Sequence, residues 1–187
     1  MYLIIRSDKR QLAEITFAVQ PETGRIFIND VGGIAEEINE GVAGTNYGWP
    51  IVEHGPKTDP RFRGPVYHYP TACIIGGAFA PTDLPWPKEY RGQYFFGDFN
   101  HGWIKTLDPP TGRAGRVNAP VVKPFATGLR RPVDLRFAPS PVPLSSGGRG
   151  RGEGDDSLYV LLRDAWVVDN LFKGGTGILL RIHPINK

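Results

Sequence analysis

Short apolar segments separated by glycine and proline recur along the whole chain, and this spacing most constrains its fold. Among 187 residues there are 24 glycines and 18 prolines, which favour tight turns between short strands. Helix-period patterns are scarce, and residues 35–42 are the best short candidate for a helix. The sequence therefore predicts an all-β fold, as a sandwich, a barrel or propeller blades. The candidate strands are residues 15–19, 25–28, 66–69, 74–79, 94–98, 103–107, 121–125, 133–137, 158–162 and 178–182.

Composition excludes several classes of protein. A hydrophobic fraction of 40% is enough for a globular core. The net charge is +3 and the basic residues are spread along the chain, so we expect no nucleic-acid partner. The single cysteine, Cys73, excludes an intrachain disulfide and is expected to be a buried, inert thiol. No apolar segment is long enough to span a bilayer, and the N-terminal segment does not resemble a signal peptide.

Residues 139–156 form a low-complexity segment with almost no apolar side chains. It separates residues 133–137 from residues 158–161, which look like neighbouring antiparallel strands. We expect a mobile insert between two strands of one sheet.

An acidic stretch follows the candidate strand at residues 25–28. Asp30, Glu36 and Glu37 supply carboxylate oxygens among glycines, a combination that suits calcium better than zinc or copper. A solvated acidic turn after an edge strand explains the same residues, and the EF-hand spacing is absent. The residues alone leave both interpretations open.

Two further groups of side chains are candidates for a site. Asp98, Asn100 and His101 lie in a turn that either aims the imidazole into a cleft or is simply built from turn-forming residues. Arg130 and Arg131, followed by Asp134, form a cationic pair that either holds an anionic ligand or forms surface ion pairs. Motifs for acyl transfer, nucleotide hydrolysis and Rossmann-type hydride transfer are absent.

Taken together, several segments resemble the glucose/sorbosone dehydrogenase family, which comprises quinoprotein sugar dehydrogenases built on a six-bladed β-propeller. The segments are residues 25–50, 65–69, 76–79, 87–104, 125–135 and 158–162. A propeller blade takes about 40 to 50 residues, so the resemblance implies a partial propeller of about three to four four-stranded blades. We expect residues 1–14 to be a divergent N-terminal segment and residues 15–187 to be the propeller portion. A further chain could supply the remaining blades.

The resemblance also implies a cofactor and a metal. The family oxidises an aldose at C1 with pyrroloquinoline quinone (PQQ) and calcium. One calcium ion would be held by the backbone carbonyls of Val31 and Gly32, next to Asp30. A second would lie near Glu37 and the backbone of Tyr47, with Glu53 as a further ligand.

On the quinone side, the resemblance implies contacts from Asn100, Arg131 and Asp134. Asn100 stands where the family has a lysine, and Val133 stands where it has a second arginine. The family's histidine base would lie before residue 25, where this sequence does not match, so no catalytic residue is assigned here.

We therefore interpret the chain as a sugar dehydrogenase-like portion that is incomplete on its own. The alternative is a non-catalytic propeller that binds carbohydrate or protein through the loops around Trp49, Trp86 and Trp103, although burial is the expected position of at least two of these rings. Members of the family are typically periplasmic or secreted, but this sequence does not establish a location.

Overall fold

The computed structural model describes residues 13–52, 59–70, 72–110, 120–138, 156–163, 167–168, 171–172 and 177–184. These residues form β-strands and one short 3-10 helix, η1. In chain order the elements are β1 (Ala13–Val19), β2 (Ile26–Val31), β3 (Ala35–Glu40), β4 (Tyr67–Pro70), β5 (Ile74–Phe79), η1 (Lys88–Tyr90), β6 (Tyr94–Asp98), β7 (Trp103–Leu107), β8 (Val122–Ala126), β9 (Pro132–Phe137), β10 (Leu158–Arg163), β11 (Val167–Val168), β12 (Leu171–Phe172) and β13 (Gly177–Ile182).

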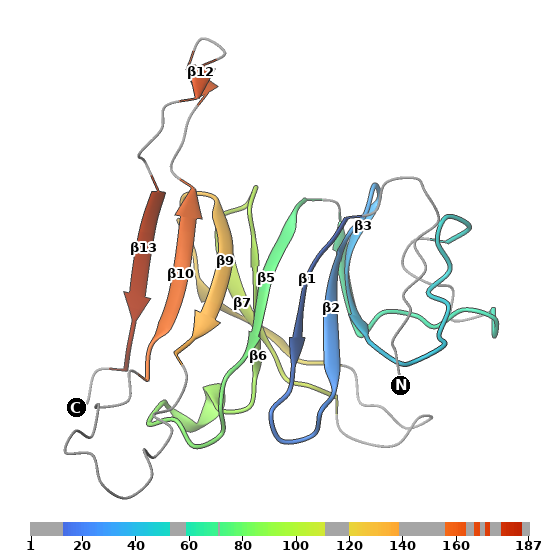
Figure 1. Cartoon of the computed structure of the whole chain (residues 1–187), viewed down its shortest axis with the longest axis horizontal. Coiled ribbons are helices and arrows are strands. Elements are labelled where there is room, and N and C mark those ends of the chain that lie inside the picture. The colour runs from blue at the N-terminus through green and yellow to red at the C-terminus, as the bar shows by residue number, and fades with distance from the viewer. Residues whose placement is uncertain are drawn as a thin grey trace, which may run out of the picture.

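The strands form three consecutive antiparallel sheets, which we call blades A, B and C (Figure 1). Blade A has the order β1-β2-β3-β4, blade B the order β5-β6-β7-β8, and blade C the order β9-β10-β13. Neighbouring blades meet through their first strands, because β1 contacts β5 and β5 contacts β9. The all-β partial propeller expected from the sequence is confirmed. Two of its blades have four strands, and the third has three among the described residues, with the hairpin β11–β12 beyond them.

Apolar residues fill the two spaces between the blades. Phe27 and Ile38 of blade A pack with Ile74, Tyr94 and Phe96 of blade B in one cluster, whose members are almost fully buried. A second cluster lies between blades B and C, with Phe95 and Ile104 on one side and Leu135, Leu158 and Val160 on the other. In β6 of blade B, Tyr94 and Phe96 face blade A and Phe95 faces blade C, as the period of two in a β-strand requires.

One secondary-structure prediction is wrong. Residues 35–40, within the candidate helix at 35–42, form strand β3, which pairs with β2 on one side and β4 on the other. The pairing of Phe137 with Leu158 agrees with the expected neighbouring strands β9 and β10. Residues 139–155 of the low-complexity insert and residues 1–12 lie outside the described part of the chain.

The antiparallel order brings several turns to one edge of the three blades. The β2–β3 and β6–β7 turns and the β4–β5 and β8–β9 connections all lie at the same ends of the strands, which are uppermost in Figure 1. We call this the upper edge. Asn100 and Arg131 lie at this edge. The β2–β3 turn, which follows Asp30, lies there as well.

Candidate functional site

Two carboxylates face each other at the upper end of blade A. Asp30 of β2 and Glu37 of β3 are directly opposite partners in the antiparallel register, so their side chains project from the same face of the sheet. Glu37 is 8% exposed. Like charges in this arrangement repel each other, and a cation between them would offset that repulsion.

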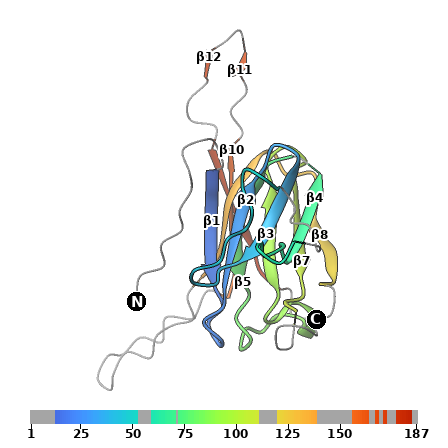
Figure 2. The same cartoon turned by 90° about the vertical axis from the view of Figure 1, so that its right-hand side faces the viewer.

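A small cavity of about 20 Å³ lies against these carboxylates. It is lined by Asp30, Gly32, Ala35, Glu37, Tyr47, Trp49 and Val52. Tyr47 and Trp49 belong to the long connection between β3 and β4, which passes across the outer face of blade A, the face that Figure 2 shows. A space of this size suits one water molecule or one ion rather than an organic molecule.

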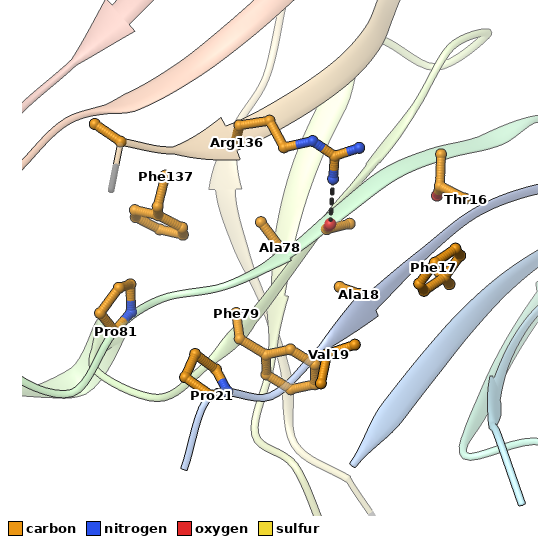
Figure 3. A pocket seen from close by; sticks show the side chains of 12 residues that line it. Thr16, Phe17, Ala18, Val19, Pro21, Ala78, Phe79, Pro81, Arg136 and Phe137 are labelled. Carbon is orange, nitrogen blue, oxygen red and sulfur yellow. Dashed lines mark hydrogen bonds between the residues drawn. The ribbon is translucent and has the colours of Figure 1, made fainter. Parts of the chain in front are cut away.

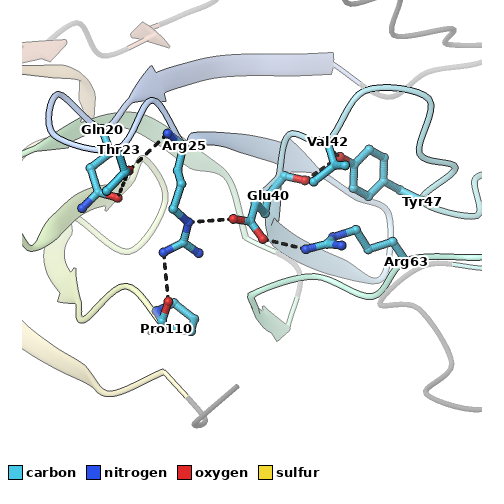
Figure 4. A network of polar contacts seen from close by, with 8 residues as sticks. All are labelled: Gln20, Thr23, Arg25, Glu40, Val42, Tyr47, Arg63 and Pro110. Carbon is cyan, nitrogen blue, oxygen red and sulfur yellow. Dashed lines mark hydrogen bonds and ion pairs between the residues drawn. The ribbon is translucent and has the colours of Figure 1, made fainter. Parts of the chain in front are cut away.

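Ion pairs and hydrogen bonds hold this connection in place (Figure 4). The Tyr47 hydroxyl donates to the Glu40 backbone oxygen at 2.6 Å and accepts from the Val42 backbone N–H at 3.1 Å. The Glu40 carboxylate pairs with Arg25 Nε at 2.7 Å and with an Arg63 guanidinium nitrogen at 2.6 Å. These contacts within the protein hold Tyr47, which lines the cavity, in place without a metal ion.

The donor set matches calcium better than a transition metal. In the described part of the chain no three His, Cys, Asp or Glu side chains gather closely enough to hold a metal ion. Two carboxylates supplemented by backbone oxygens are typical of calcium ligation. Gly32 lines the cavity, whereas Val31 does not. Glu53 lies outside the described residues. Asn39, whose amide donates to Glu37 Oε2 at 3.1 Å, has a buried Oδ1 atom without a hydrogen bond.

Asn100 and Arg131 both border the β6–β7 turn. The Asn100 amide donates to the Ala72 backbone oxygen at 2.9 Å, which links this turn to the β4–β5 connection. The Arg131 guanidinium lies over the Phe99 ring, 5.5 Å from its centroid. Arg131 has a φ of 49°, and its backbone oxygen accepts from the Arg163 backbone N–H at 2.9 Å. The two residues thus lie on adjacent blades at the upper edge.

Asp134 lies further along β9, away from the turn. Its Oδ2 atom is 3.4 Å from Arg136 Nε, and its Oδ1 atom is buried without a hydrogen bond among the described residues. Its main chain packs closely on Gly76 of β5, where an added Cβ would meet backbone atoms of Asp134 and Leu135. The structure therefore places Asp134 beside Arg136 and apart from Asn100.

Sequence reasoning missed a buried acidic network that joins blades A and B. The fully buried Asp98 accepts from the Tyr69 hydroxyl at 2.8 Å, from the Cys73 N–H at 3.1 Å and from the His101 N–H at 2.7 Å. His101 Nδ1 is 3.2 Å from Asp98 Oδ1. Asp98 thus stabilises the β6–β7 turn through the His101 N–H, in agreement with the interpretation of these residues as turn-forming. Through the Tyr69 hydroxyl it also links this turn to blade A.

Glu36 has a similar role and is not part of an acidic loop. It is fully buried, and its two carboxylate oxygens accept from the backbone N–H groups of Ala72 and Ile74 at 3.0 and 2.9 Å. Glu36 and Glu37 point to opposite faces of β3 because neighbouring residues of a strand alternate. The three acidic residues grouped by sequence therefore divide between a cavity and a blade interface.

The hydroxyl groups near this network resist ionisation. Burial, reinforced by the Asp98 carboxylate, raises the pKa of Tyr69, and burial raises the pKa of Tyr94. Burial, with Glu36 and Asp98 nearby, also raises the pKa of the Cys73 thiol. Cys73 is only partly buried, which differs from the expected buried position, but its raised pKa keeps the thiol protonated at neutral pH, in agreement with the expected inertness.

We expect the free energy of unfolding to fall as the pH rises above about 10, the ordinary tyrosine pKa. Above that pH the unfolded chain releases tyrosine protons that the folded chain keeps on Tyr69 and Tyr94, so unfolding becomes more favourable. Tyr69→Phe should lower the slope by up to about 1.4 kcal/mol per pH unit. Urea unfolding of both proteins between pH 8 and 11.5 measures this, and equal slopes would contradict the assignment.

The three tryptophans that the structure describes do not form an exposed stacking surface. Trp86 is 3% exposed and belongs to the core between blades B and C. Trp103 packs against Tyr69 and Phe96 in the other core, and Lys105 Nζ lies 4.1 Å from its ring centroid. Trp49 lines the small cavity. Burial is confirmed for Trp86, whereas Trp49 and Trp103 are only partly buried, so the expectation that at least two of these rings are buried is not met.

Solved structures with the same fold support the architecture. An oxidoreductase of Thermus thermophilus described as a glucose dehydrogenase is 26% identical, with a TM-score of 0.64 over 89% of this chain and 43% of that chain. The PQQ-bound aldose sugar dehydrogenase of Streptomyces coelicolor is 23% identical, with a TM-score of 0.58 over 88% of this chain and 41% of that chain. The apo form of the soluble aldose sugar dehydrogenase of Escherichia coli is 22% identical, with a TM-score of 0.59 over 94% of this chain and 45% of that chain.

The chain thus spans less than half the length of the solved structures it matches. No curated protein matches it. Among the described residues no helix is long and apolar enough to cross a membrane. The family model for glucose/sorbosone dehydrogenase matches residues 12–130, which include the cavity on blade A and the turn at Asn100 and end just before Arg131. With that match over more than half of its length, the chain belongs to the glucose/sorbosone dehydrogenase family.

Proposed function

We propose that this chain carries part of the active site of a PQQ-dependent sugar dehydrogenase, with a calcium ion at the cavity on blade A. The observation that carries the proposal is the pair Asp30 and Glu37, opposite each other in register beside a cavity of about 20 Å³. Arg131 and Asn100 lie at the same edge of the neighbouring blades. Family membership and the PQQ-bound relative from Streptomyces coelicolor support the choice of cofactor.

Two groups of residues would have separate roles, one in binding calcium and one in binding the quinone. The Asp30 and Glu37 carboxylates, with backbone oxygen from the β2–β3 turn and the Tyr47 connection, would hold calcium. Arg131 would attract an anionic carboxylate of the quinone by a charge-assisted hydrogen bond, and Asn100 would border it. When bound, PQQ supplies the electron-accepting chemistry that oxidises an aldose at C1. Asp134, which lies away from this edge beside Arg136, is given no contact with the quinone.

Our proposal assigns no general base to this chain. The base expected from the family resemblance would precede residue 25, and the residues there do not match it. We therefore propose that the 187-residue chain binds calcium and does not turn over sugar by itself. Turnover of an aldose by the purified chain with calcium and PQQ would contradict this part.

Calcium should raise the thermal stability of the chain. A ligand that binds only the folded state at 100 times its dissociation constant adds about 2.7 kcal/mol, which corresponds to a rise of several degrees in the unfolding temperature for a protein of this size. We expect Asp30→Asn and Glu37→Gln to abolish most of that rise. Thermal unfolding in excess calcium and in excess chelator, with calorimetric titration of calcium, measures both effects.

Glu22→Gln is the matched control, since Glu22 is exposed and its carboxylate accepts from the Thr82 hydroxyl far from the cavity. This variant should respond to calcium like the wild type. If Asp30→Asn and Glu37→Gln also respond like the wild type, calcium binds elsewhere and the assignment fails. Titration with PQQ and with simple sugars then separates the two functions, because sugar binding without quinone favours a non-catalytic carbohydrate-binding propeller.

A further inference from the structure

We propose that Glu40 fastens the β3–β4 connection over the small cavity on blade A, and that this contact sets the affinity of the cavity for calcium. The inference rests on the proposed function, since it concerns the same cavity. Glu40 does not line the cavity. It is paired in register with Phe27, which packs between blades A and B, so its side chain projects from the sheet face opposite to that of Glu37. Glu40 is therefore a positioning residue and not a ligand.

The β3–β4 connection forms the outer wall of the cavity but is weakly anchored in the core. Tyr47 and Trp49 line the cavity from this connection. Among its described residues, 41–52 and 59–66, Gly48 alone is buried. This part of the connection thus has no fully buried apolar side chain, so its position depends on polar contacts.

Glu40 is the meeting point of these contacts (Figure 4). Its two carboxylate oxygens accept from different arginines, Oε1 from Arg25 at 2.7 Å and Oε2 from Arg63 at 2.6 Å. Its backbone oxygen accepts from the Tyr47 hydroxyl at 2.6 Å. Arg63 lies in the later part of the connection, and its backbone N–H donates to the Asn46 backbone oxygen in the earlier part at 2.9 Å. Glu40 therefore holds both parts of the connection to the end of β3.

Arg25 fixes the Glu40 carboxylate from the side of the core. The Arg25 guanidinium also donates to the Pro110 backbone oxygen beyond β7 at 2.9 Å and lies 5.2 Å from the ring centroid of Phe27. Arg25 is thus held by blades A and B together, whereas the Arg63 side chain is 38% exposed. Loss of the contact between Arg63 and Glu40 would release the connection and leave the two blades in place.

A fixed wall favours ion binding because the oxygen atoms around the ion must be held at short distances. Residues that orient metal ligands without touching the metal typically change its affinity by about 10- to 100-fold when they are replaced. We therefore expect Glu40→Gln to weaken calcium binding by about tenfold or more.

The larger groove of the described residues is unsuited to a cation (Figure 3). It has a volume of about 560 Å³, runs along β1, β5 and β9, and is lined by apolar residues apart from Thr16 and Arg136. The Arg136 guanidinium donates to the Gly77 backbone oxygen at 3.1 Å, and its charge would repel a cation there. Calcium is thus expected at the acidic cavity, where Glu40 can influence it.

The two partners in the clamp allow a test that separates position from charge. Glu40→Gln removes a negative charge, and Arg63→Gln removes a positive one. If the charge near the cavity alone mattered, the two variants would shift calcium affinity in opposite directions. If the connection must be fastened, both should weaken calcium binding by about tenfold or more, and Arg63→Lys, which keeps the charge and a donor, should restore most of the affinity. Calorimetric titration with calcium chloride measures all three.

Arg61→Gln is the matched control for Arg63→Gln. Arg61 lies on the same connection, but its side chain is 70% exposed and pairs with Asp59 at 2.6 Å. This variant removes the same charge and should bind calcium like the wild type. Glu22→Gln serves in the same way for Glu40→Gln.

Two further measurements report on the wall itself. Terbium can replace calcium, and its emission is excited by a nearby tryptophan, so terbium beside Trp49 should emit less strongly in Glu40→Gln than in the wild type. Trp49→Phe should lose this emission. In chelator, the Val42 and Arg63 amides, which bond to the Tyr47 hydroxyl and the Asn46 oxygen, should exchange hydrogen faster in Glu40→Gln, with no change in the strands of blade B.

The outcomes distinguish this inference from the proposed function. If the wild type binds calcium and the Glu40 and Arg63 variants bind it equally tightly, or shift in opposite directions, the inference is overturned and the proposed function stands. Unchanged amide exchange at Val42 and Arg63 would also overturn the inference. A wild type that binds neither calcium nor terbium would overturn the proposed function, and this inference with it.

Discussion

Replacing Asp98 with alanine should lower the free energy of unfolding by about 3 to 5 kcal/mol. The carboxylate is fully buried and accepts hydrogen bonds from Tyr69, Cys73 and His101. Its removal would leave the Tyr69 hydroxyl and two backbone N–H groups without an acceptor, and each unpaired buried donor costs about 1 to 3 kcal/mol. Urea unfolding at fixed protein concentration measures the loss.

Asp98→Asn and Asp108→Ala are the comparisons for this prediction. Asparagine keeps the shape of the side chain and one acceptor oxygen. Asp98→Asn should therefore lower the free energy of unfolding by less than Asp98→Ala does, but by more than a substitution at an exposed position does. Asp108 is exposed, and its carboxylate accepts from the Gln93 amide at the surface, so Asp108→Ala should stay within about 0.5 kcal/mol of wild type. Similar losses at Asp98 and Asp108 would show that the buried network does not join the blades.

Replacing Phe95 with alanine should also cost about 3 to 5 kcal/mol. The ring is fully buried in the core between blades B and C. It packs edge-on against Phe125 and Phe137, with ring centroids 5.0 and 5.1 Å away, and against Trp86 at 6.1 Å. A cavity at this position removes contacts with both blades at once, and the surrounding strands cannot close it without disturbing their pairing.

The same urea experiment tests Phe95→Ala, and Phe95→Leu indicates how much of the loss is due to the cavity. Leucine fills part of the space and should recover a substantial share of the stability. Val121→Ala, at an exposed position, should change the free energy of unfolding by no more than about 0.5 kcal/mol. A loss below about 1 kcal/mol at Phe95 would mean that this core does not couple blades B and C.

Most strands could be predicted from the sequence, because their apolar runs end at glycine, proline, asparagine or aspartate. The short strands β11 and β12 were not predicted, and strand β3 was predicted as a helix. Its sequence, with alanine and three glutamates in six residues, has high intrinsic helix propensity. Pairing with β2 and β4 on both sides outweighs that local preference, and the strand conformation places Ile38 in the core.

The site was predictable where it depends on turns and unpredictable where it depends on distant segments. Asn100 and Arg131 lie beside turns that the sequence marks with glycine and aspartate, so their place at one edge follows from strand order. The role of Glu36 depends on the backbone of Ile74, 38 residues away along the chain. No local pattern indicates that partner, and the same applies to Asp98 and Tyr69.

The backbone of Arg131 has a consequence for how the upper edge would receive an anion. A φ of 49° is unusual for a residue with a side chain and costs about 1 to 2 kcal/mol. The fold maintains it through the hydrogen bond from Arg163 and the packing of the guanidinium on Phe99. Since this charge is preordered before any ligand arrives, binding would lose little conformational entropy there. Under the proposed function, anion affinity at this edge would therefore depend on the docking of blade C, and a change that loosens this blade would weaken anion binding even at a distance from Arg131.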